Sequence, residues 1–444
     1  MSKRNAKQLN LGSNSAGQII RSCARFAVAE CRENGEVGLP EGGQRLYGGA
    51  MSLITDTPTL AAVCQRLRQC RYVTVDTEFM REKTYWPQLC LVQLAGPEEA
   101  WAVDPLAPDI DLAPLFELMA DPAVLKVFHA ARQDIEIFLH LSGAVPTPVF
   151  DTQIAAMVCG FGDAVSYETL ATQLARARID KSMRFTDWSA RPLTERQLHY
   201  ALSDVTHLRP AYEKLQKRLD RDGRVEWLKE EMEILADPAT YRVDPEEAWR
   251  RLKPRSNSPR FLMVLKELAA WREREAQDRD LPRQRVVRDE TLLEIAAHAP
   301  TNVDDLARTR GLTRGTAEGR HGAMILEIVA RALKAPDLAC PQPPERHDLP
   351  RGLGPVVDLL RVLLKLKCDQ NDVAQRLIAS GPDLDLIAAD DHATVPALQG
   401  WRRHLFGDDA LRLKHGKIGL ALAADGKSLR LIPLEDAPIS APTA

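Results

Sequence analysis

Two acidic side chains stand two residues apart in an apolar segment, and their spacing is the first sign of chemistry in this sequence. Asp76 and Glu78 lie in Tyr-Val-Thr-Val-Asp-Thr-Glu-Phe, which has the composition of a β-strand. Because side chains alternate along a strand, both carboxylates point to one face. Neighbouring anions repel each other, and a hard divalent cation with oxygen ligands relieves that cost. The pair therefore suggests a metal site, although by itself it is more typical of a solvated sheet face.

Two later segments carry further candidate residues. Asp134 opens an apolar helical run after His129-Ala-Ala-Arg-Gln, where it is either a carboxylate favoured by the helix N-terminus or a metal ligand. Tyr200 and Asp204 follow a capping-box pattern that begins at Thr194. Four residues apart on a helix, they share one face, either as a surface pair or as parts of a site.

Taken together, these segments resemble the three exonuclease motifs of the DEDD superfamily, Tyr subtype, and the ribonuclease D family in particular. The motifs are Asp-Thr-Glu-Phe (76–79), His-Ala-Ala-Arg-Gln-Asp (129–134) and Tyr-Ala-Leu-Ser-Asp (200–204). Supporting stretches lie at 86–94, 150–153 and 180–194. Further along, 268–276 and 280–290 resemble an HRDC domain, and a second, more diverged HRDC-like unit is expected downstream.

The resemblance implies a fold, a metal centre and a reaction. The fold is an α/β RNase H-like domain with a mixed sheet, followed by two all-α HRDC-type domains. Asp76, Glu78, Asp134 and Asp204 would hold two divalent cations, Mg²⁺ or Mn²⁺, and Tyr200 and Glu78 would orient the attacking water. An unperturbed tyrosine, with a pKa of about 10, is a poor base at neutral pH, which favours orientation as the role of Tyr200.

The implied activity is 3′→5′ trimming of RNA with release of 5′-mononucleotides, in particular 3′ processing of precursor tRNA. Four basic residues are predicted to contact the substrate, although solvated loop charges explain them equally well: Lys181, Arg184, Arg283 and Arg285. Asp151, which follows an apolar run, is expected in a structural or supporting role and not as a fifth ligand. His129 is expected in the core or beside the ligands, because hard-ion sites favour oxygen over imidazole.

The elements that must position these residues follow from periodicity. Short β-rich runs at 72–79, 89–95 and 100–103 are separated by brief turns, which predicts antiparallel pairing. Another strand is expected at 124–128, and helices are expected at 60–67, 113–119 and 134–141. This order predicts a mixed sheet covered by helices.

The chain divides into several parts by composition, and strand signals stop after residue 218. Two all-α blocks follow, with a similar rhythm at 292–296 and 375–379. The expected parts are a disordered leader (1–50), the exonuclease domain (51–220), a helical connector (221–256), the first HRDC domain (257–335), a Pro-rich linker (336–349), the second HRDC-like domain (350–425) and a tail (426–444).

Charge and composition limit the partners. The 444 residues carry 59 basic and 62 acidic side chains, a net charge of −3, so RNA binding requires local basic patches. One such window, 250–288, contains twelve basic and five acidic residues and suits salt-dependent phosphate contacts or a solvated helix surface. Within it, Phe261, Leu265, Leu268 and Trp271 recur at helical spacing and are expected in the core.

The remaining predictions concern location, cofactors and rival functions. The eight scattered cysteines favour a reducing, cytoplasmic compartment, and no segment is apolar enough for a membrane. No nucleotide cofactor is expected, because position 421 is Ala where a phosphate loop ending in Gly-Lys-Ser needs Gly. A monomer is favoured. The rival functions are a DNA 3′→5′ exonuclease and a catalytically inactive RNA-binding module, which would need none of the carboxylates.

Overall fold

The fold is described from a computed structural model that covers residues 45–46, 51–180, 182–254, 256–342, 350 and 352–434. The predicted leader lies almost wholly outside these residues, as do Lys181, residues 343–349 of the linker and residues 435–444 of the tail. Within the described helices, none combines the length and apolar character that a membrane crossing requires.

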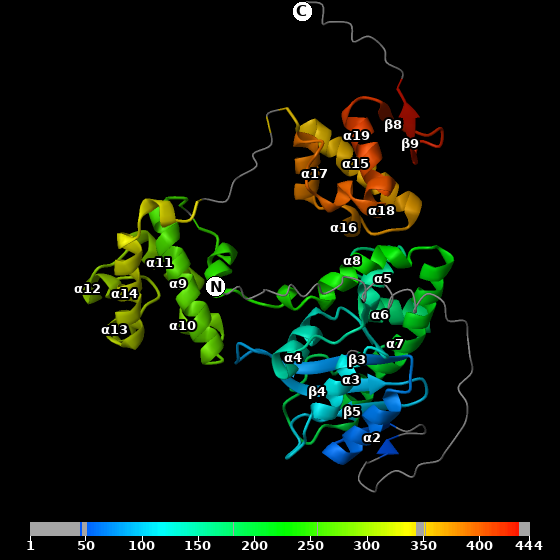
Figure 1. The fold of residues 1–444 in the computed structure, drawn as a ribbon, viewed down its shortest axis with the longest axis horizontal. Helices are drawn as coiled ribbons and strands as arrows, with labels where there is room; N and C mark the ends of the chain where they lie inside the picture. Colours follow the sequence, from blue (N-terminus) through cyan, green and yellow to red (C-terminus); the bar gives the residue numbers. More distant parts are fainter. Residues whose placement is uncertain are drawn as a thin grey trace, which may run out of the picture. The chain divides into compact units, whose positions relative to one another are not determined.

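A seven-stranded mixed sheet, in the order β1-β2-β5-β4-β3-β6-β7, forms the centre of the first domain (Figure 1). Strands β3, β4 and β5 pair antiparallel, and β2, β6 and β7 join by parallel pairing. The predicted mixed sheet and its antiparallel centre are confirmed, and β1, β2 and β7 are strands that the sequence analysis missed, β1 within the predicted disordered leader. The strands are β1 (Arg45–Leu46), β2 (Met51–Ile54), β3 (Tyr72–Met80), β4 (Gln88–Ala95), β5 (Ala100–Val103), β6 (Leu125–Phe128) and β7 (Val149–Asp151).

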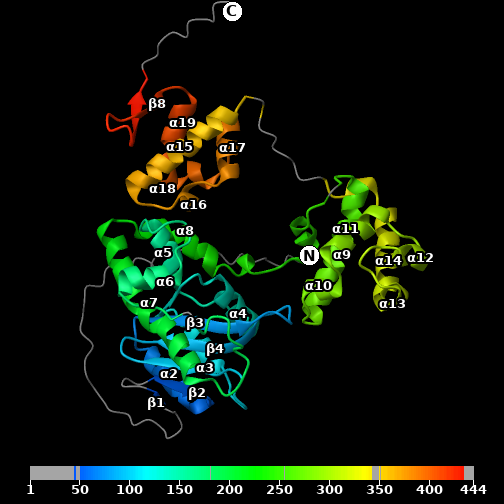
Figure 2. The ribbon, with the colours of Figure 1, turned by 180° about the vertical axis from the view of Figure 1, so that it is seen from behind.

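Helices cover both faces of this sheet. On one face, apolar side chains of α2 (Thr57–Leu67), α3 (Ala113–Ala120) and α4 (Arg132–Ser142) pack with those of β3, β4 and β5. On the other face, Leu198, Ala201, Leu202 and Val205 of α7 (Glu195–Arg221) pack on β4 and β5. Figure 2 shows α7 and the sheet from behind. The remaining helical elements of this domain are α5 (Thr152–Val158), α6 (Tyr167–Leu170) and a π-turn (Ala171–Ala175).

The long helix α7 begins directly after Thr194, as the capping-box pattern predicted. The Thr194 side chain accepts from the backbone N–H of Gln197, and the Gln197 side chain accepts from the backbone N–H of Thr194. This reciprocal box satisfies two donors that a helix start otherwise leaves without partners. The cap fixes the helical phase that places Tyr200 and Asp204 on the face toward the sheet.

A helical region follows residue 221, and its core matches the prediction. Phe261, Leu265, Leu268 and Trp271 are all buried in one apolar cluster of this region. The helices up to the linker are α8 (Val225–Ala236), α9 (Pro259–Asp278), α10 (Arg283–Val286), α11 (Asp289–His298), α12 (Val303–Ala307), α13 (Arg314–Glu318) and α14 (Arg320–Lys334), with 3₁₀ turns at Pro238–Thr240, Pro245–Arg251 and Asp337–Ala339.

The last part of the chain is not all-α, so the predicted end of strands after residue 218 is wrong. A hairpin of β8 (Ile418–Leu422) and β9 (Leu429–Pro433) turns at Gly426, where φ is +66°. The alternation of Ile418, Leu420 and Leu422 was hidden because Gly and Ala, which are poor strand formers, occupy the positions between them. The preceding helices are α15 (Gly354–Asn371), α16 (Gln375–Ile378), α17 (Gly381–Ala389), α18 (Gly400–Arg402) and α19 (Asp408–Lys414), with a 3₁₀ turn at Pro396–Leu398 and a π-turn at Arg403–Gly407.

Candidate active site

Strand β3 carries the first two carboxylates past the point where its parallel neighbour pairs with it. Pairing with β6 covers only Tyr72 to Thr74, whereas pairing with β4 continues to Met80, with an irregularity between Glu78 and Phe79. Asp76 and Glu78 therefore lie on the α7 face of β3, beside an edge that β6 leaves open.

Asp134 reaches this edge from the first turn of α4. The turn before α4 places Ala130 at a φ of +58°. Asp151 holds that turn by accepting the backbone N–H groups of Ala130 and Ala131 at 3.1 and 2.8 Å, which is a structural role. Asp134 is 7% exposed, and its Oδ1 accepts the hydroxyl of Thr77 on β3.

The fourth carboxylate, Asp204, comes from α7. One carboxylate oxygen from each of Asp76, Glu78 and Asp204 lies within 4.8 Å of the others. Asp134 adds its charge to the same cluster, because it raises the pKa of both Asp76 and Glu78. Three of the four acidic residues named from the sequence thus gather within 4.8 Å, and Asp134 lies outside that group but near enough for its charge to act on Asp76 and Glu78.

Burial and mutual repulsion disfavour the charged forms of this cluster. Burial is the largest cause that raises the pKa of Asp76 well above its usual value, followed by the charges of Asp204, Asp134 and Glu78. The same effects raise the pKa of Glu78 to about 9. Burial also raises the pKa values of Asp134 and Asp204. A cluster of this kind is costly unless positive charge enters it.

Among the described residues, two buried polar groups at the cluster have no hydrogen-bond partner. Within the described part of the chain, Asp204 Oδ1 is buried without a hydrogen-bond partner. Gln93, which pairs with Asp76 across β3 and β4, is fully buried, and both polar atoms of its side chain lack a partner. The carboxylates offer oxygen ligands only, which is the donor set of hard divalent cations. The residues present therefore fit divalent metal ions.

Tyr200 lies on the same face of α7 as Asp204, one turn earlier. Its ring centroid is 6.1 Å from that of the buried Trp188. Burial, followed by the charges of Asp204, Glu78 and Asp76, raises the pKa of Tyr200 above its usual value. The hydroxyl thus stays protonated at neutral pH and can donate a hydrogen bond beside the carboxylates.

Tyr167 is a residue of this site that the sequence analysis missed. Its hydroxyl donates to the backbone carbonyl oxygens of Ser203, at 3.0 Å, and of Asp204. Its ring meets that of His129 edge-on, with the centroids 5.6 Å apart. The pattern Ser166-x-x-Thr169 signals the short helix that carries Tyr167, but nothing in the local sequence shows which carbonyls its hydroxyl meets.

The basic residues predicted to contact substrate have different surroundings. Arg184 and Arg285 are exposed. The guanidinium of Arg283 instead donates to both carboxylate oxygens of Glu273, at 2.6 and 2.5 Å, and to the Tyr85 hydroxyl at 2.8 Å. Many cations of the 250–288 window also pair with acids, which reduces its excess of positive charge: Arg250, Arg260, Lys266, Arg272, Arg274 and Arg279.

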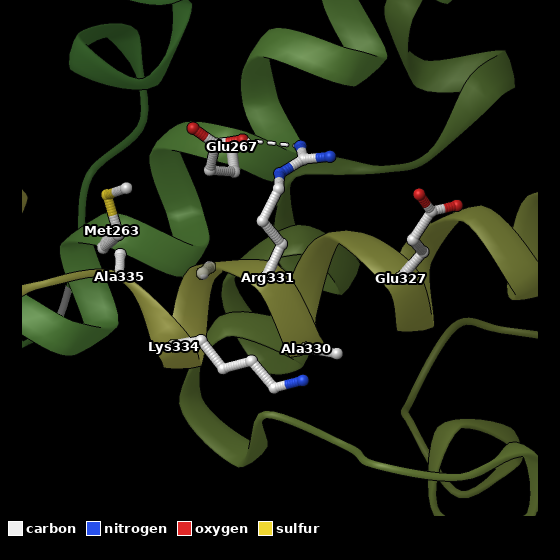
Figure 3. Close-up of a pocket in the computed structure, with 8 residues that line it drawn as sticks. Met263, Glu267, Glu327, Ala330, Arg331, Lys334 and Ala335 are labelled. Atoms are coloured by element: carbon white, nitrogen blue, oxygen red, sulfur yellow. Dashed lines mark hydrogen bonds and ion pairs between the residues drawn. The ribbon is translucent and has the colours of Figure 1, made fainter.

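A hollow with a volume of about 600 Å³ lies elsewhere, between α9 and α14 (Figure 3). Met263, Lys334 and Ala335 line it, and an ion pair of 2.7 Å between Arg331 and Glu267 crosses one side. None of the four clustered carboxylates lines it. The hollow is therefore separate from the carboxylate cluster.

Comparisons with known proteins agree with this geometry. Residues 51–220 match a 3′-5′ exonuclease family, and residues 261–329 match the HRDC domain family. The ribonuclease D of Gluconacetobacter diazotrophicus is 55% identical over 381 residues, which is 86% of this chain and 96% of that protein. The ribonuclease D of Granulibacter bethesdensis is 54% identical over the same shares of the two chains. The crystal structure of Escherichia coli RNase D, an exoribonuclease involved in structured RNA processing, is 32% identical with a TM-score of 0.71 and covers 82% of this chain and 98% of that one.

Proposed function

Because the chain belongs to the ribonuclease D family, we propose that it trims the 3′ ends of precursor tRNAs and releases 5′-mononucleotides. The chain is a 3′→5′ exoribonuclease. The gathering of carboxylate oxygens from Asp76, Glu78 and Asp204 within 4.8 Å supports metal-dependent hydrolysis, whereas the tRNA substrate rests on the family alone. A cytoplasmic location and a monomeric state remain predictions.

In this proposal the four carboxylates hold two divalent cations, Mg²⁺ or Mn²⁺. Such ions would stabilise the attacking and leaving oxygens of an in-line displacement. Asp76, Glu78 and Asp204 supply oxygens from β3 and α7, and Asp134 supplies its own from α4. The Thr77 hydroxyl holds the Asp134 carboxylate in place.

The attacking water is oriented by Tyr200 and Glu78. The raised pKa of Tyr200 keeps its phenol protonated, so it donates a hydrogen bond and does not remove a proton. Glu78 accepts a hydrogen bond from the same water. Tyr167 fixes the turn of α7 that carries Asp204 through the two backbone carbonyls that accept its hydroxyl. The chain thereby positions the reacting oxygen before substrate arrives.

Digestion of end-labelled oligonucleotides tests the activity against its rivals. A 5′-labelled RNA should shorten one nucleotide at a time with Mg²⁺ or Mn²⁺, and EDTA should stop the reaction. A circular RNA of the same sequence should stay intact, since it has no 3′ end. Faster shortening of the matching DNA would favour a DNA exonuclease. RNA that is bound but never cut would favour an inactive binding module.

The tRNA substrate needs its own test. A precursor tRNA with a few extra 3′ nucleotides should be trimmed to a discrete product, because the folded acceptor stem blocks further shortening. An unstructured RNA of equal length should be shortened throughout. Equal, unlimited degradation of both RNAs would contradict a role in tRNA 3′ processing while leaving the exoribonuclease activity intact.

We also propose that residues 354–414 form a second HRDC-like unit, on the basis of a backbone pattern shared with the first. A long helix, α9 or α15, is followed by an aspartate at positive φ, Asp280 (+50°) or Asp372 (+46°). A four-residue helix, α10 or α16, begins three residues later, and the residue after each has a φ of −153°. By this pattern, residues 375–379 of the second unit are equivalent to α10 of the first. The sequence rhythm had instead matched them to residues 292–296 in α11.

Both aspartates also contact earlier segments of the chain, Asp280 through its side chain and Asp372 through its backbone carbonyl. Asp280 Oδ1 accepts the backbone N–H groups of Tyr85 and Trp86, which connect β3 to β4. The Asp372 carbonyl oxygen accepts from Arg224, which also donates to Val158 at the end of α5. In each helical unit, the segment between the first two helices contacts the residues around the exonuclease domain. This repeated use supports a duplicated module.

A further inference from the structure

One aromatic side chain near the proposed site is almost fully exposed. Phe185 is 92% exposed in the segment that leads into α7. Single exposed apolar residues are common on protein surfaces, so exposure alone means little. The position of Phe185 near Tyr200, and the charged residues beside Phe185, point to a function for the exposed ring.

The segment that carries Phe185 is fastened to the start of α7. The side-chain amide of Gln197 donates to the Thr186 hydroxyl at 3.2 Å, and Arg196 donates to the Ser182 hydroxyl at 3.2 Å. Phe185 therefore lies between two attachments to the first turn of the helix that carries Tyr200 one turn later.

A second set of contacts holds the residues after Phe185. Trp188 is buried, and its ring centroid lies 6.1 Å from that of Tyr200. Arg191 donates to the Asp104 carboxylate, to the Trp188 carbonyl and to the Cys90 carbonyl, each at 2.7 Å. The ring of Phe185 is thus presented by a segment whose both ends are anchored beside the proposed site.

A cation lies against the ring. The Arg184 guanidinium carbon lies 5.3 Å from the centroid of the Phe185 ring, which is within the range of a cation–π contact. Arg184 is near enough to Tyr200 for its charge to oppose, without reversing, the rise in the pKa of that phenol. The nearby carboxylates of Asp180 and Asp187 accept hydrogen bonds from Ser182 and Ser189 at 2.9 Å, respectively.

We propose that Phe185, flanked by Arg184, is a stacking platform for a base near the 3′ end of the RNA, a role that rests on the proposed exoribonuclease activity. An aromatic ring accepts any base, because every base has a π-face. A platform of this kind suits an enzyme that must shorten RNA through any sequence. Arg184 contributes a cation for the adjacent phosphate.

Substitution of Phe185 tests the platform. Phe185→Ala should lower kcat/KM on single-stranded RNA by about 5- to 150-fold, mainly through KM. Phe185→Trp should keep near-normal activity, since indole stacks as well as phenyl. The thermal midpoint should be unchanged in both variants because the side chain buries almost nothing. Leu338→Ala, at a fully exposed position next to the linker, is the matched control and should leave kcat/KM unaltered.

A cycle that combines protein and RNA changes identifies the stacked base. A set of RNAs is made in which each carries one abasic nucleotide, at a different position from the 3′ end. At one position, loss of the base should lower the activity of wild type but should not lower the activity of Phe185→Ala any further. Independent, additive losses at every position would overturn the platform. So would equal kcat/KM for wild type and Phe185→Ala. If wild type fails to shorten RNA at all, the proposed activity itself fails, which is a different result.

A binding measurement separates stacking from catalysis. In EDTA, a short oligoadenylate should quench the extra tryptophan fluorescence of Phe185→Trp relative to wild type. The same RNA should bind Phe185→Ala more weakly by a similar factor to the loss in kcat/KM. Unquenched emission together with unchanged binding would contradict a base stacked at this position.

Discussion

Two sites in this chain bury carboxylate groups, and burial disfavours the charged form at both, but their surroundings shift the carboxyl pKa values in opposite directions. In the carboxylate cluster of Asp76, Glu78, Asp134 and Asp204, burial and mutual repulsion raise the pKa values. In the second cluster, Glu273 is 1% exposed, but both its oxygens accept from Arg283, and the Tyr85 hydroxyl donates to it at 2.5 Å. Burial would raise the pKa of Glu273, but these bonds outweigh it and hold the pKa below its usual value.

The difference separates a structural site from a functional one. The charge of Glu273 is balanced by Arg283 of the same chain. Its hydrogen bonds link α9 to α10 and to Tyr85 in the segment between β3 and β4. Among the described residues, the carboxylate cluster leaves one buried oxygen, Asp204 Oδ1, without a hydrogen-bond partner. A fold that accepts such a cost needs an external cation to relieve it. The sequence analysis predicted that Arg283 contacts RNA, whereas its guanidinium pairs with Glu273. A basic residue gives the same sequence signal whether it binds RNA or pairs with a buried glutamate.

The largest expected effect comes from removing one ligand of the carboxylate cluster. Asp76→Asn should lower the rate of RNA shortening by at least about 10²-fold, because it misplaces the reacting groups. It should not weaken the metal-free fold, since it removes a repulsive buried charge. Rates on end-labelled RNA and urea unfolding in EDTA measure the two effects. Near-normal turnover would remove Asp76 from the site.

Breaking the balanced cluster should have the reverse outcome. Arg283→Leu leaves Glu273 buried without its partner and should lower the free energy of unfolding by about 3–5 kcal/mol. The double variant Arg283→Leu/Glu273→Leu should recover much of this loss. Arg308→Ala, which removes an exposed ion pair with Asp305, is the control and should cost about 0–1 kcal/mol. A loss no larger than that of the control would contradict the structural role of Arg283.

The two clusters should also differ in their pH dependence. Raised pKa values mean that the native carboxylate cluster binds more protons than the unfolded chain above the ordinary carboxyl pKa of about 4. The stability of the metal-free protein should therefore fall as the pH rises from 5 toward 9, the value to which the pKa of Glu78 is raised. Asp76→Asn should weaken this fall.

Glu273 should show the opposite sign. Its lowered pKa contributes stability above the unfolded pKa of about 4.3, and that contribution is lost as the pH falls through the folded value. Glu273→Gln should therefore destabilise the protein more at pH 7 than at pH 4. Thermal melts across pH in EDTA test both signs. Parallel pH profiles for the Asp76 and Glu273 variants would show that the two clusters do not differ.

The smallest effect is expected at Tyr167, which supports the site without belonging to the carboxylate cluster. Tyr167→Phe removes the donor to the Ser203 and Asp204 carbonyls and should cost about 0.5–1.5 kcal/mol of stability. If the hydroxyl positions Asp204, Mg²⁺ should also protect this variant less against unfolding than it protects wild type. Unaltered protection would restrict Tyr167 to a structural role.

Sequence reasoning recovered the parts of the site that short-range rules govern. Alternation placed Asp76 and Glu78 on one face of a strand, and the spacing of four placed Tyr200 beside Asp204 on a helix. The capping box located the start of α7. Tyr167 and Gln93 escaped because their significance lies in contacts with distant segments. The β8–β9 hairpin escaped because weak strand formers masked a short alternation.

The sequence by itself thus determined the elements that carry the motifs, the order of the motifs and the acidic character of the site. Only the tertiary structure decided that Asp134 meets the edge of β3 left open by β6, and that Arg283 serves Glu273. The physical reason is range. Backbone preferences and side-chain periodicity act over a few residues, whereas the distance between two charged groups depends on strand register and helix packing across the whole domain.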